Sequence, residues 1–209
     1  MQRHQNPAIL DPFAGSCATL LAAAHITSLP SSSQLSKPQP NPGGCRSIAI
    51  EIAHDGYVNK DDIVEDFVTR SLTPPSKIIH GSCLSSEVRD QARLAIGKGA
   101  FDAIVTDPPY GIREAMSSEG DSENSEEDSI SPLTKLFYAM GDDRSNDTPL
   151  LKSGGRLVAF VPVREGEILE DCLPDSNARE AAGLVMEGEG KEQVLSDILS
   201  RWLVSFICL

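Results

Sequence analysis

Four consecutive residues, Asp107-Pro108-Pro109-Tyr110, combine the side chains and the stiffness needed to activate an amine. An exocyclic amine on a base is a poor nucleophile because its lone pair is delocalised into the ring. Its attack requires acceptors that orient the N–H groups and draw off a proton as the new bond forms. The Asp107 carboxylate and the Pro108 carbonyl supply two acceptors, and the prolines set the loop geometry in advance by fixing φ. Tyr110 adds an aromatic face on which an extruded base can stack.

A second group of residues is suited to a cationic, nucleoside-like ligand. The run Asp11-Pro12-Phe13-Ala14-Gly15-Ser16 contains a glycine turn, which lets a ligand approach the backbone closely, in front of a predicted helix N-terminus. The acid that opens the run can meet a cationic group such as an α-ammonium. Glu51 follows the next apolar run and is placed to accept hydrogen bonds from two ribose hydroxyls. Each group also has a simpler interpretation: a tight strand-to-helix turn for residues 11–16, a solvated acid for Glu51 and a proline-stiffened turn for residues 107–110.

The elements that must position these residues alternate between strands and helices. The predicted strands are residues 8–10, 47–52, 77–80, 101–106, 156–163, 184–187 and 202–208. The predicted helices are residues 18–25, 61–69, 87–96, 133–140 and, more weakly, 192–199. This alternation predicts an α/β fold with a doubly wound, mostly parallel sheet, in which ligands bind beyond the carboxyl ends of the strands. The turn at 11–16, Glu51 and the loop at 107–110 each come at the end of a predicted strand.

Length and charge constrain the partners. The 209 residues, 40% of them hydrophobic, fit one α/β domain. The 18 basic and 31 acidic residues give a net charge of -13, which is unfavourable for direct contact with nucleic-acid phosphates. A nucleic-acid substrate would therefore have to be held by another domain or subunit. Residues 29–44 are rich in Pro, Ser and Gly, and residues 117–129 in Ser and acids, so both are predicted to be disordered insertions.

The sequence disfavours several other classes of protein: disulfide-rich, metal-binding, secreted and membrane-spanning. The five cysteines form no CxxC pair and the four histidines no HxxxH pair, so we predict neither a disulfide framework nor a metal site. The apolar run near the N-terminus is short and follows an Asp-Pro turn, unlike a signal peptide. No run approaches the length of a membrane span. The expected location is the cytoplasm.

These strings resemble a known family. DPFAGS followed by DPPY is similar to the class I amino-methyltransferases. The string TDPPYGIREA at 106–115 resembles the tRNA guanine-10 N2-methyltransferase family, as do GGRLVAFVPV and the closing EQVLSDILSRWLV. The resemblance implies a seven-stranded, Rossmann-like class I methyltransferase fold, with one catalytic domain over residues 1–209. It also implies S-adenosyl-L-methionine as cofactor and direct methyl transfer to guanine N2, without a covalent enzyme intermediate.

The resemblance also assigns roles to individual residues. The catalytic residues would be Asp107, Pro108, Pro109 and Tyr110. The cofactor-binding residues would be Asp11, Pro12, Phe13, Gly15, Glu51, Ser82 and Asp107, with Ser82 near the adenine by its position in the fold. Arg113 and Glu114 match recognition residues of the family, although an exposed ion pair is the simpler explanation.

The chain also departs from the family pattern. Cys17 stands where the motif usually has a second glycine, so a positive φ there would lower cofactor affinity. No part of these 209 residues resembles the family's N-terminal THUMP region, so tRNA is expected to be gripped by a separate or missing region. A small zinc-binding activator subunit is a further implied partner. Two alternatives stay open: another DPPY-type enzyme acting on adenine N6, cytosine N4 or protein glutamine, and a catalytically silent subunit or fragment. Asp107 and the GIREA extension favour guanine over the first alternative.

Overall fold

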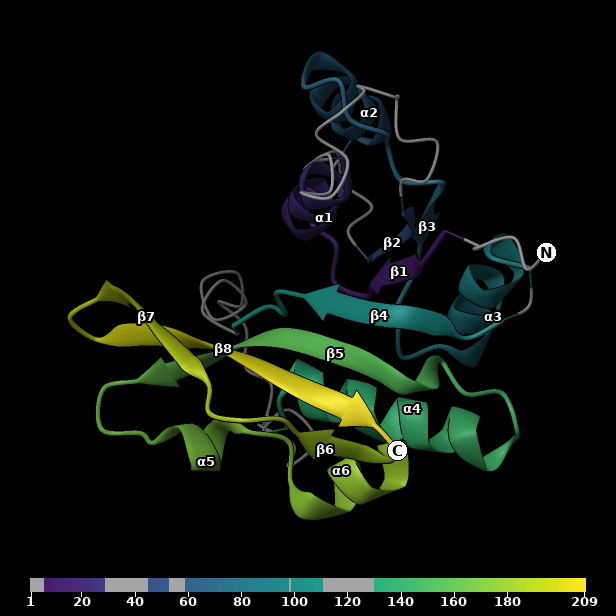
Figure 1. The fold of residues 1–209 in the computed structure, drawn as a ribbon. Coiled ribbons are helices and arrows are strands. Elements are labelled where there is room, and N and C mark those ends of the chain that lie inside the picture. The colour runs from purple at the N-terminus through teal and green to yellow at the C-terminus, as the bar shows by residue number, and fades with distance from the viewer. Residues whose placement is uncertain (1–5, 29–44, 53–58, 98, 111–129) are drawn as a thin grey trace, which may run out of the picture. The chain divides into compact units, whose positions relative to one another are not determined.

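The computed structural model describes residues 6–28, 45–52, 59–97, 99–110 and 130–209. The chain divides into two compact units, Met1–Thr106 and Asp107–Leu209 (Figure 1). Both predicted insertions, at 29–44 and 117–129, lie outside the described residues, as do Arg113 and Glu114. The assignment of residues 1–209 to one domain stays a prediction.

The first unit is a parallel sheet with helices in its connections. Its strands are β1 (Ala8–Asp11), β2 (Arg46–Glu51), β3 (Lys77–His80) and β4 (Phe101–Thr106). They lie in the order β3-β2-β1-β4, and every neighbouring pair is parallel. The helices are α1 (Ala18–Ser28), α2 (Lys60–Thr69) and α3 (Ser86–Ala95). Each helix connects two of these strands, as parallel neighbours require. The bounds predicted for β3 and β4 are confirmed.

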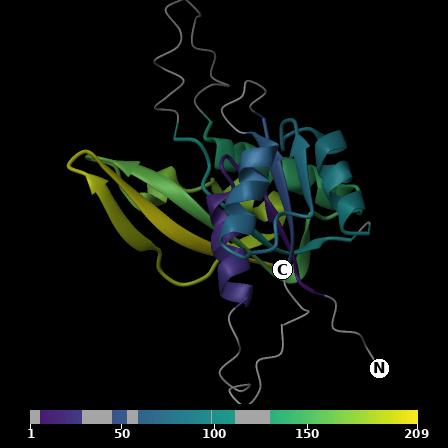
Figure 2. The same ribbon diagram turned by 90° about the horizontal axis from the view of Figure 1, so that it is seen from above.

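Alternation along the strands divides the core of the first unit between two faces. On one face, a cluster that includes Cys17, Leu20 and Phe67 joins α1 and α2 to the sheet. Successive strand residues point to opposite faces, so Leu10 and Ile48, which are fully buried, lie on the other one. There α3 contacts β2 and β3. Helices therefore cover both faces of these parallel strands (Figure 2).

The second unit is antiparallel. Its strands are β5 (Leu151–Arg164), β6 (Leu184–Met186), β7 (Lys191–Ser196) and β8 (Leu199–Cys208). Strand β8 pairs with β5, with β6 and with β7, antiparallel in every case. The helices are α4 (Pro132–Ser145), α5 (Leu169–Cys172) and α6 (Ser176–Ala182).

Helix α4 packs on both β8 and α6. It begins with Ser131 as N-cap, whose side chain accepts from the Thr134 amide at 3.1 Å. Phe137 meets Phe206 of β8 in an edge-to-face contact, with 5.1 Å between the ring centroids. Gly141 permits close contact with α6, because an added Cβ would lie 2.8 Å from the Cβ of Ala181.

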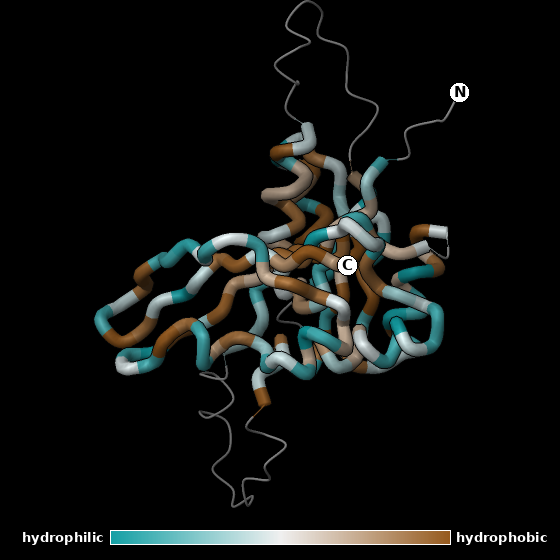
Figure 3. The backbone as a smooth tube through the Cα atoms, turned by 60° about the horizontal axis from the view of Figure 1, so that its bottom comes forward, coloured by the Kyte–Doolittle hydropathy of each residue, from teal (hydrophilic) through white to brown (hydrophobic). Residues whose placement is uncertain are grey.

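The helix predicted at 192–199 is wrong, because this segment forms β7 and the turn into β8. Val194, Leu195 and Ile198 have a spacing that suggests a helical face, but their side chains are exposed. Backbone pairing of residues 191–196 with β8 decides the structure instead, since tertiary context overrides weak local preference. Figure 3 shows hydrophobic residues along this hairpin. The described residues thus form eight strands rather than seven. None of the described helices is long and apolar enough to cross a membrane.

Candidate functional site

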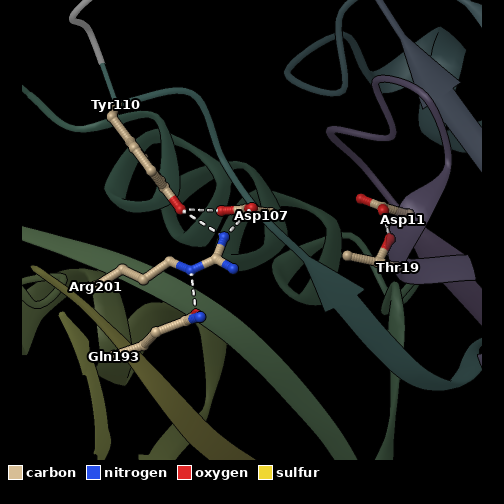
Figure 4. Close-up of polar contacts among 6 residues, drawn as sticks. All are labelled: Asp11, Thr19, Asp107, Tyr110, Gln193 and Arg201. Atoms are coloured by element: carbon tan, nitrogen blue, oxygen red, sulfur yellow. Dashed lines mark hydrogen bonds and ion pairs between the residues drawn. The ribbon is translucent and has the colours of Figure 1, made fainter. Parts of the chain in front are cut away.

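The carboxylate of Asp11 is directed into the first unit. The residue is 1% exposed and ends β1. Its Oδ1 accepts from the Phe13 amide at 3.1 Å and from the Thr106 hydroxyl at 2.9 Å, and its Oδ2 accepts from the Thr19 hydroxyl (Figure 4). Asp11 therefore joins the end of β1, the first turn of α1 and the end of β4. Direct contact between this carboxylate and a cofactor stays a prediction.

Glu51 and Gly15 meet at the carboxyl ends of β1 and β2. The Gly15 amide donates to Oε2 of Glu51 at 2.6 Å. Gly15 has a φ of 49°, and an added Cβ would meet no atom of the described residues within 4 Å, so these residues leave open space beside the turn. Ser82 comes two residues after β3, whose last residue, His80, pairs with Glu51. The structure thus brings Gly15, Glu51 and the segment that precedes Ser82 to the same edge of the parallel sheet.

Cys17 adopts the conformation that makes glycine the usual residue in this motif. Its φ is 62°, a left-handed value that costs a residue with a Cβ about 1–2 kcal/mol. The side chain is fully buried. Burial raises the pKa of its thiol to about 12, and the carboxylates of Asp11 and Glu51 add to the rise. The thiol is therefore protonated at neutral pH and cannot act as a nucleophile.

Cys83, which follows β3, also has a thiol whose pKa is raised. Burial is the main reason that the pKa of its thiol rises to about 12, with Asp11 and Glu51 again contributing. Arg89 acts in the opposite direction and donates to the Cys83 carbonyl at 2.9 Å. The carboxylates of Asp11 and Glu51 therefore contribute to the raised pKa of both thiols. An edge with this charge suits a cationic ligand.

The predicted amine-binding residues open the second unit. The Tyr110 phenol donates to Oδ1 of Asp107, and both side chains are partly exposed. Burial raises the pKa of this phenol to about 12, opposed by Arg201 and reinforced by Asp107. The phenol is therefore a hydrogen-bond donor at neutral pH. Pro108 is buried and Pro109 exposed, so the loop is anchored by the first proline.

Three polar residues next to the predicted ones were missed by the sequence analysis. Thr19 and Thr106 bind the Asp11 carboxylate, and single threonines carry no sequence signal for such a role. Arg201 of β8 forms an ion pair with Asp107, with 2.8 Å between Nη1 and Oδ2 (Figure 4). A signal did exist for Arg201, since it lies within the string EQVLSDILSRWLV. Among the described residues, no group of His, Cys, Asp or Glu side chains is arranged to hold a metal ion.

Comparison with known families now identifies the chain. Residues 2–124, more than half of the 209, match the family described as UPF0020: RMKL-like, methyltransferase domain. The chain belongs to this methyltransferase family. The matched segment includes the DPFAGS turn, Glu51 and the DPPY loop of this RMKL-like methyltransferase.

Curated relatives of this RMKL-like methyltransferase carry one name. The tRNA (guanine(10)-N(2))-methyltransferase TRMT11 of Gallus gallus is 33% identical over 132 residues, which cover 58% of this chain and 27% of that protein. The human protein of the same name is 33% identical over 132 residues, covering 56% of this chain and 27% of its own length. The chain spans about a quarter of the length of the curated relatives it matches.

Solved structures extend the likeness over nearly the whole chain. An rRNA methylase from Streptococcus thermophilus has a TM-score of 0.52 at 11% identity, covering 98% of this chain and 89% of that one. Aeropyrum pernix fibrillarin, solved with natively bound S-adenosyl-L-methionine, has a TM-score of 0.51 at 14% identity, covering 97% and 67%. At these identities the likeness concerns the fold. The predicted class I, Rossmann-like α/β fold is confirmed.

Proposed function

We propose that this methyltransferase transfers a methyl group from S-adenosyl-L-methionine to the N2 amine of a guanine in tRNA. The observation that carries the proposal is the Asp107–Tyr110 pair, a carboxylate acceptor beside an aromatic ring in a proline-stiffened loop. The names of the relatives favour tRNA guanine as the substrate. Asp in the first position of the loop and the GIREA extension favour the same base.

The first unit offers a suitable site for the cofactor. The open space beside Gly15 leaves room for a ligand against the backbone, and the field of Asp11 and Glu51 suits a positive charge. When bound, S-adenosyl-L-methionine supplies a cationic sulfonium and an electrophilic methyl group. Glu51 would hold the ribose hydroxyls, and Ser82 would lie near the adenine. Asp11, buried and bonded to Thr19 and Thr106, would keep the turn in shape.

The loop of the second unit would prepare the amine. Asp107 and the Pro108 carbonyl would each accept one N–H of the guanine N2 group, which fixes its orientation. As the amine becomes positively charged, the carboxylate stabilises that charge and offers a place for the proton. The Tyr110 ring would stack on the extruded base. With Asp107 acting in this way, the transfer needs no covalent intermediate between the substrate and the enzyme.

Substrate RNA would be gripped mainly by other parts. With a net charge of -13, this chain is poorly suited to bind phosphates by itself. A separate RNA-binding region would supply that contact, and a small zinc-binding subunit is proposed as an activator. Assays should therefore compare the chain alone with the chain together with such a subunit.

The cofactor is tested by calorimetric titration of S-adenosyl-L-methionine. We expect saturable binding that Glu51→Ala weakens at least about tenfold, because hydrogen bonds to a carboxylate contribute about 1.5–3 kcal/mol. Glu65→Ala, which removes an exposed acid of α2, should leave the affinity unchanged. Absence of binding by the folded chain would contradict the cofactor assignment and favour a silent subunit.

The acceptor is tested with two tRNA transcripts that differ at one position. One carries guanine at position 10 and the other inosine, which lacks the N2 amine. Transfer should occur only to the first, and Asp107→Ala should lower its rate at saturating cofactor by about 100-fold or more. Asp142→Asn, an exposed acid of α4, is the matched control. Equal methylation of both transcripts, or transfer only to adenine, cytosine or glutamine substrates, would refute guanine N2 as the acceptor.

A further inference from the structure

Arg201 of β8 contacts the Asp107–Tyr110 pair and is itself held by two other strands. Its Nη1 donates to Oδ2 of Asp107 at 2.8 Å and lies 3.4 Å from the phenol oxygen of Tyr110. Its Nε donates to Oε1 of Gln193 of β7 at 2.8 Å (Figure 4). Its guanidinium carbon lies over the Phe160 ring of β5, 4.0 Å from the ring centroid.

The sheet fixes this guanidinium independently of the loop. Gln193 stands directly opposite Arg201 in the pairing of β7 with β8. On the other side Arg201 pairs with Pro162, and Phe160 is the diagonal neighbour on the same face. A guanidinium is planar and its N–H donors form a rigid fork. Gln193 holds the Nε atom and the Phe160 ring holds one face of the guanidinium plane, and together these contacts determine the direction of Nη1.

We propose that Arg201 is a positioning residue for the amine-binding loop, which orients the Asp107 carboxylate and the Tyr110 phenol toward the target base. The proposal rests on the proposed function, since it concerns the same loop. Pro108 and Pro109 stiffen the backbone of the loop but leave the χ angles of Asp107 free. Arg201 supplies the missing constraint from a strand that is distant in the chain.

The contacts leave room for the substrate. An ionised carboxylate has about four lone-pair positions on its two oxygens. Among the described residues, Tyr110 donates to Oδ1 and Arg201 to Oδ2. One direction on each oxygen thus remains for an incoming N–H. Tyr110 and Arg201 therefore orient the Asp107 carboxylate and still leave lone pairs that can accept a hydrogen bond from the substrate.

A purely structural ion pair would behave differently. The side chains of Arg201 and Asp107 are 23% and 35% exposed, and pairs of this kind contribute little to stability. Arg156 and Glu187 form a comparable pair in the same sheet, with 2.7 Å between Nε and Oε2. Neither belongs to the proposed site. Arg156→Met is therefore the matched control for Arg201→Met.

The first experiment measures methyl transfer to the guanine-10 transcript under saturating cofactor. Arg201→Met should lower kcat by about tenfold to a hundredfold, because misplacing a reacting group by about 1 Å has effects of this size. Cofactor affinity should stay unchanged. Arg201→Lys should restore only part of the rate, since an ammonium lacks the fork. Arg156→Met should match the wild type. Gln193→Leu, on the exposed β7, should give a smaller loss and serves if Arg201→Met fails to fold.

The second experiment needs no activity. The chain has three tyrosines, so Tyr57→Phe with Tyr138→Phe leaves one, which can be replaced by a fluorotyrosine and titrated by fluorine NMR. Arg201 lowers the pKa of the Tyr110 phenol and Asp107 raises it. Arg201→Met should therefore shift the titration upward, and Asp107→Asn should shift it downward. Arg156→Met should leave it in place.

The two experiments separate this proposal from the proposed function. A wild-type rate in Arg201→Met, or a fall in kcat that only follows lost stability or lost cofactor binding, would overturn the positioning role. So would an unchanged titration of Tyr110 in Arg201→Met. If the wild-type chain transfers no methyl group to any transcript, the proposed function fails. The titration alone then decides whether Arg201 holds the pair.

Discussion

The hydrogen bond from Thr106 to Asp11 supports a quantitative prediction. Thr106 is 2% exposed and Asp11 1% exposed, and the hydroxyl lies 2.9 Å from Oδ1. A hydrogen bond to a charged group contributes about 1.5–3 kcal/mol, and burial of both partners excludes replacement by water. Thr106→Val keeps the shape and removes the donor. We expect it to lower the free energy of unfolding by about 2 kcal/mol.

Urea unfolding followed by circular dichroism measures this loss. With a slope of about 2 kcal/mol per molar urea, the midpoint should fall by about 1 M. Thr106→Ser keeps the hydroxyl and should lose only about 1 kcal/mol for the buried methyl group. In an Asp11→Asn background, Thr106→Val should cost less, because the charge that strengthens the bond is gone. A loss below about 0.5 kcal/mol, or an equal loss in both backgrounds, would refute the assigned role of this network.

Two further predictions concern packing and thiol chemistry. Gly141→Ala should destabilise the fold by about 1–3 kcal/mol in thermal unfolding, because its Cβ would meet Ala181 at 2.8 Å. Gly99→Ala should change little, because its Cβ would meet no atom of the described residues within 4 Å. Equal melting temperatures would contradict the close packing of α4 on α6. Cys17 and Cys83 should resist a disulfide reagent at about pH 8 until denaturant is added, and prompt reaction of either would contradict its burial. Both thiols ionise near 9 when unfolded and near 12 when folded, so stability should fall as pH rises through that window.

The sequence predicted the local elements well where the pattern was strong. Residues 77–80 and 101–106 form strands with those bounds, because short apolar runs between turn residues have few alternatives. Strand β5 begins at Leu151 rather than Arg156, so Gly154 lies inside it. The error at 192–199 has a physical cause as well. An exposed hairpin strand has no buried face to impose alternation, and only its partner strand makes it extended.

The site shows the same division. By itself the sequence predicted the chemistry that we propose, because a carboxylate, two prolines and a tyrosine in a row are adjacent in the chain. It also predicted that Asp11 and Glu51 lie at or near the ends of strands, since apolar runs mark where strands stop, whereas the structure shows that these two strands are parallel neighbours. Only the tertiary structure decided that Asp11 turns inward to two threonines and that Asp107 meets an arginine 94 residues away. Which atoms complete a carboxylate's hydrogen bonds depends on strand pairing, and pairing brings together residues whose separation in the chain no local pattern encodes.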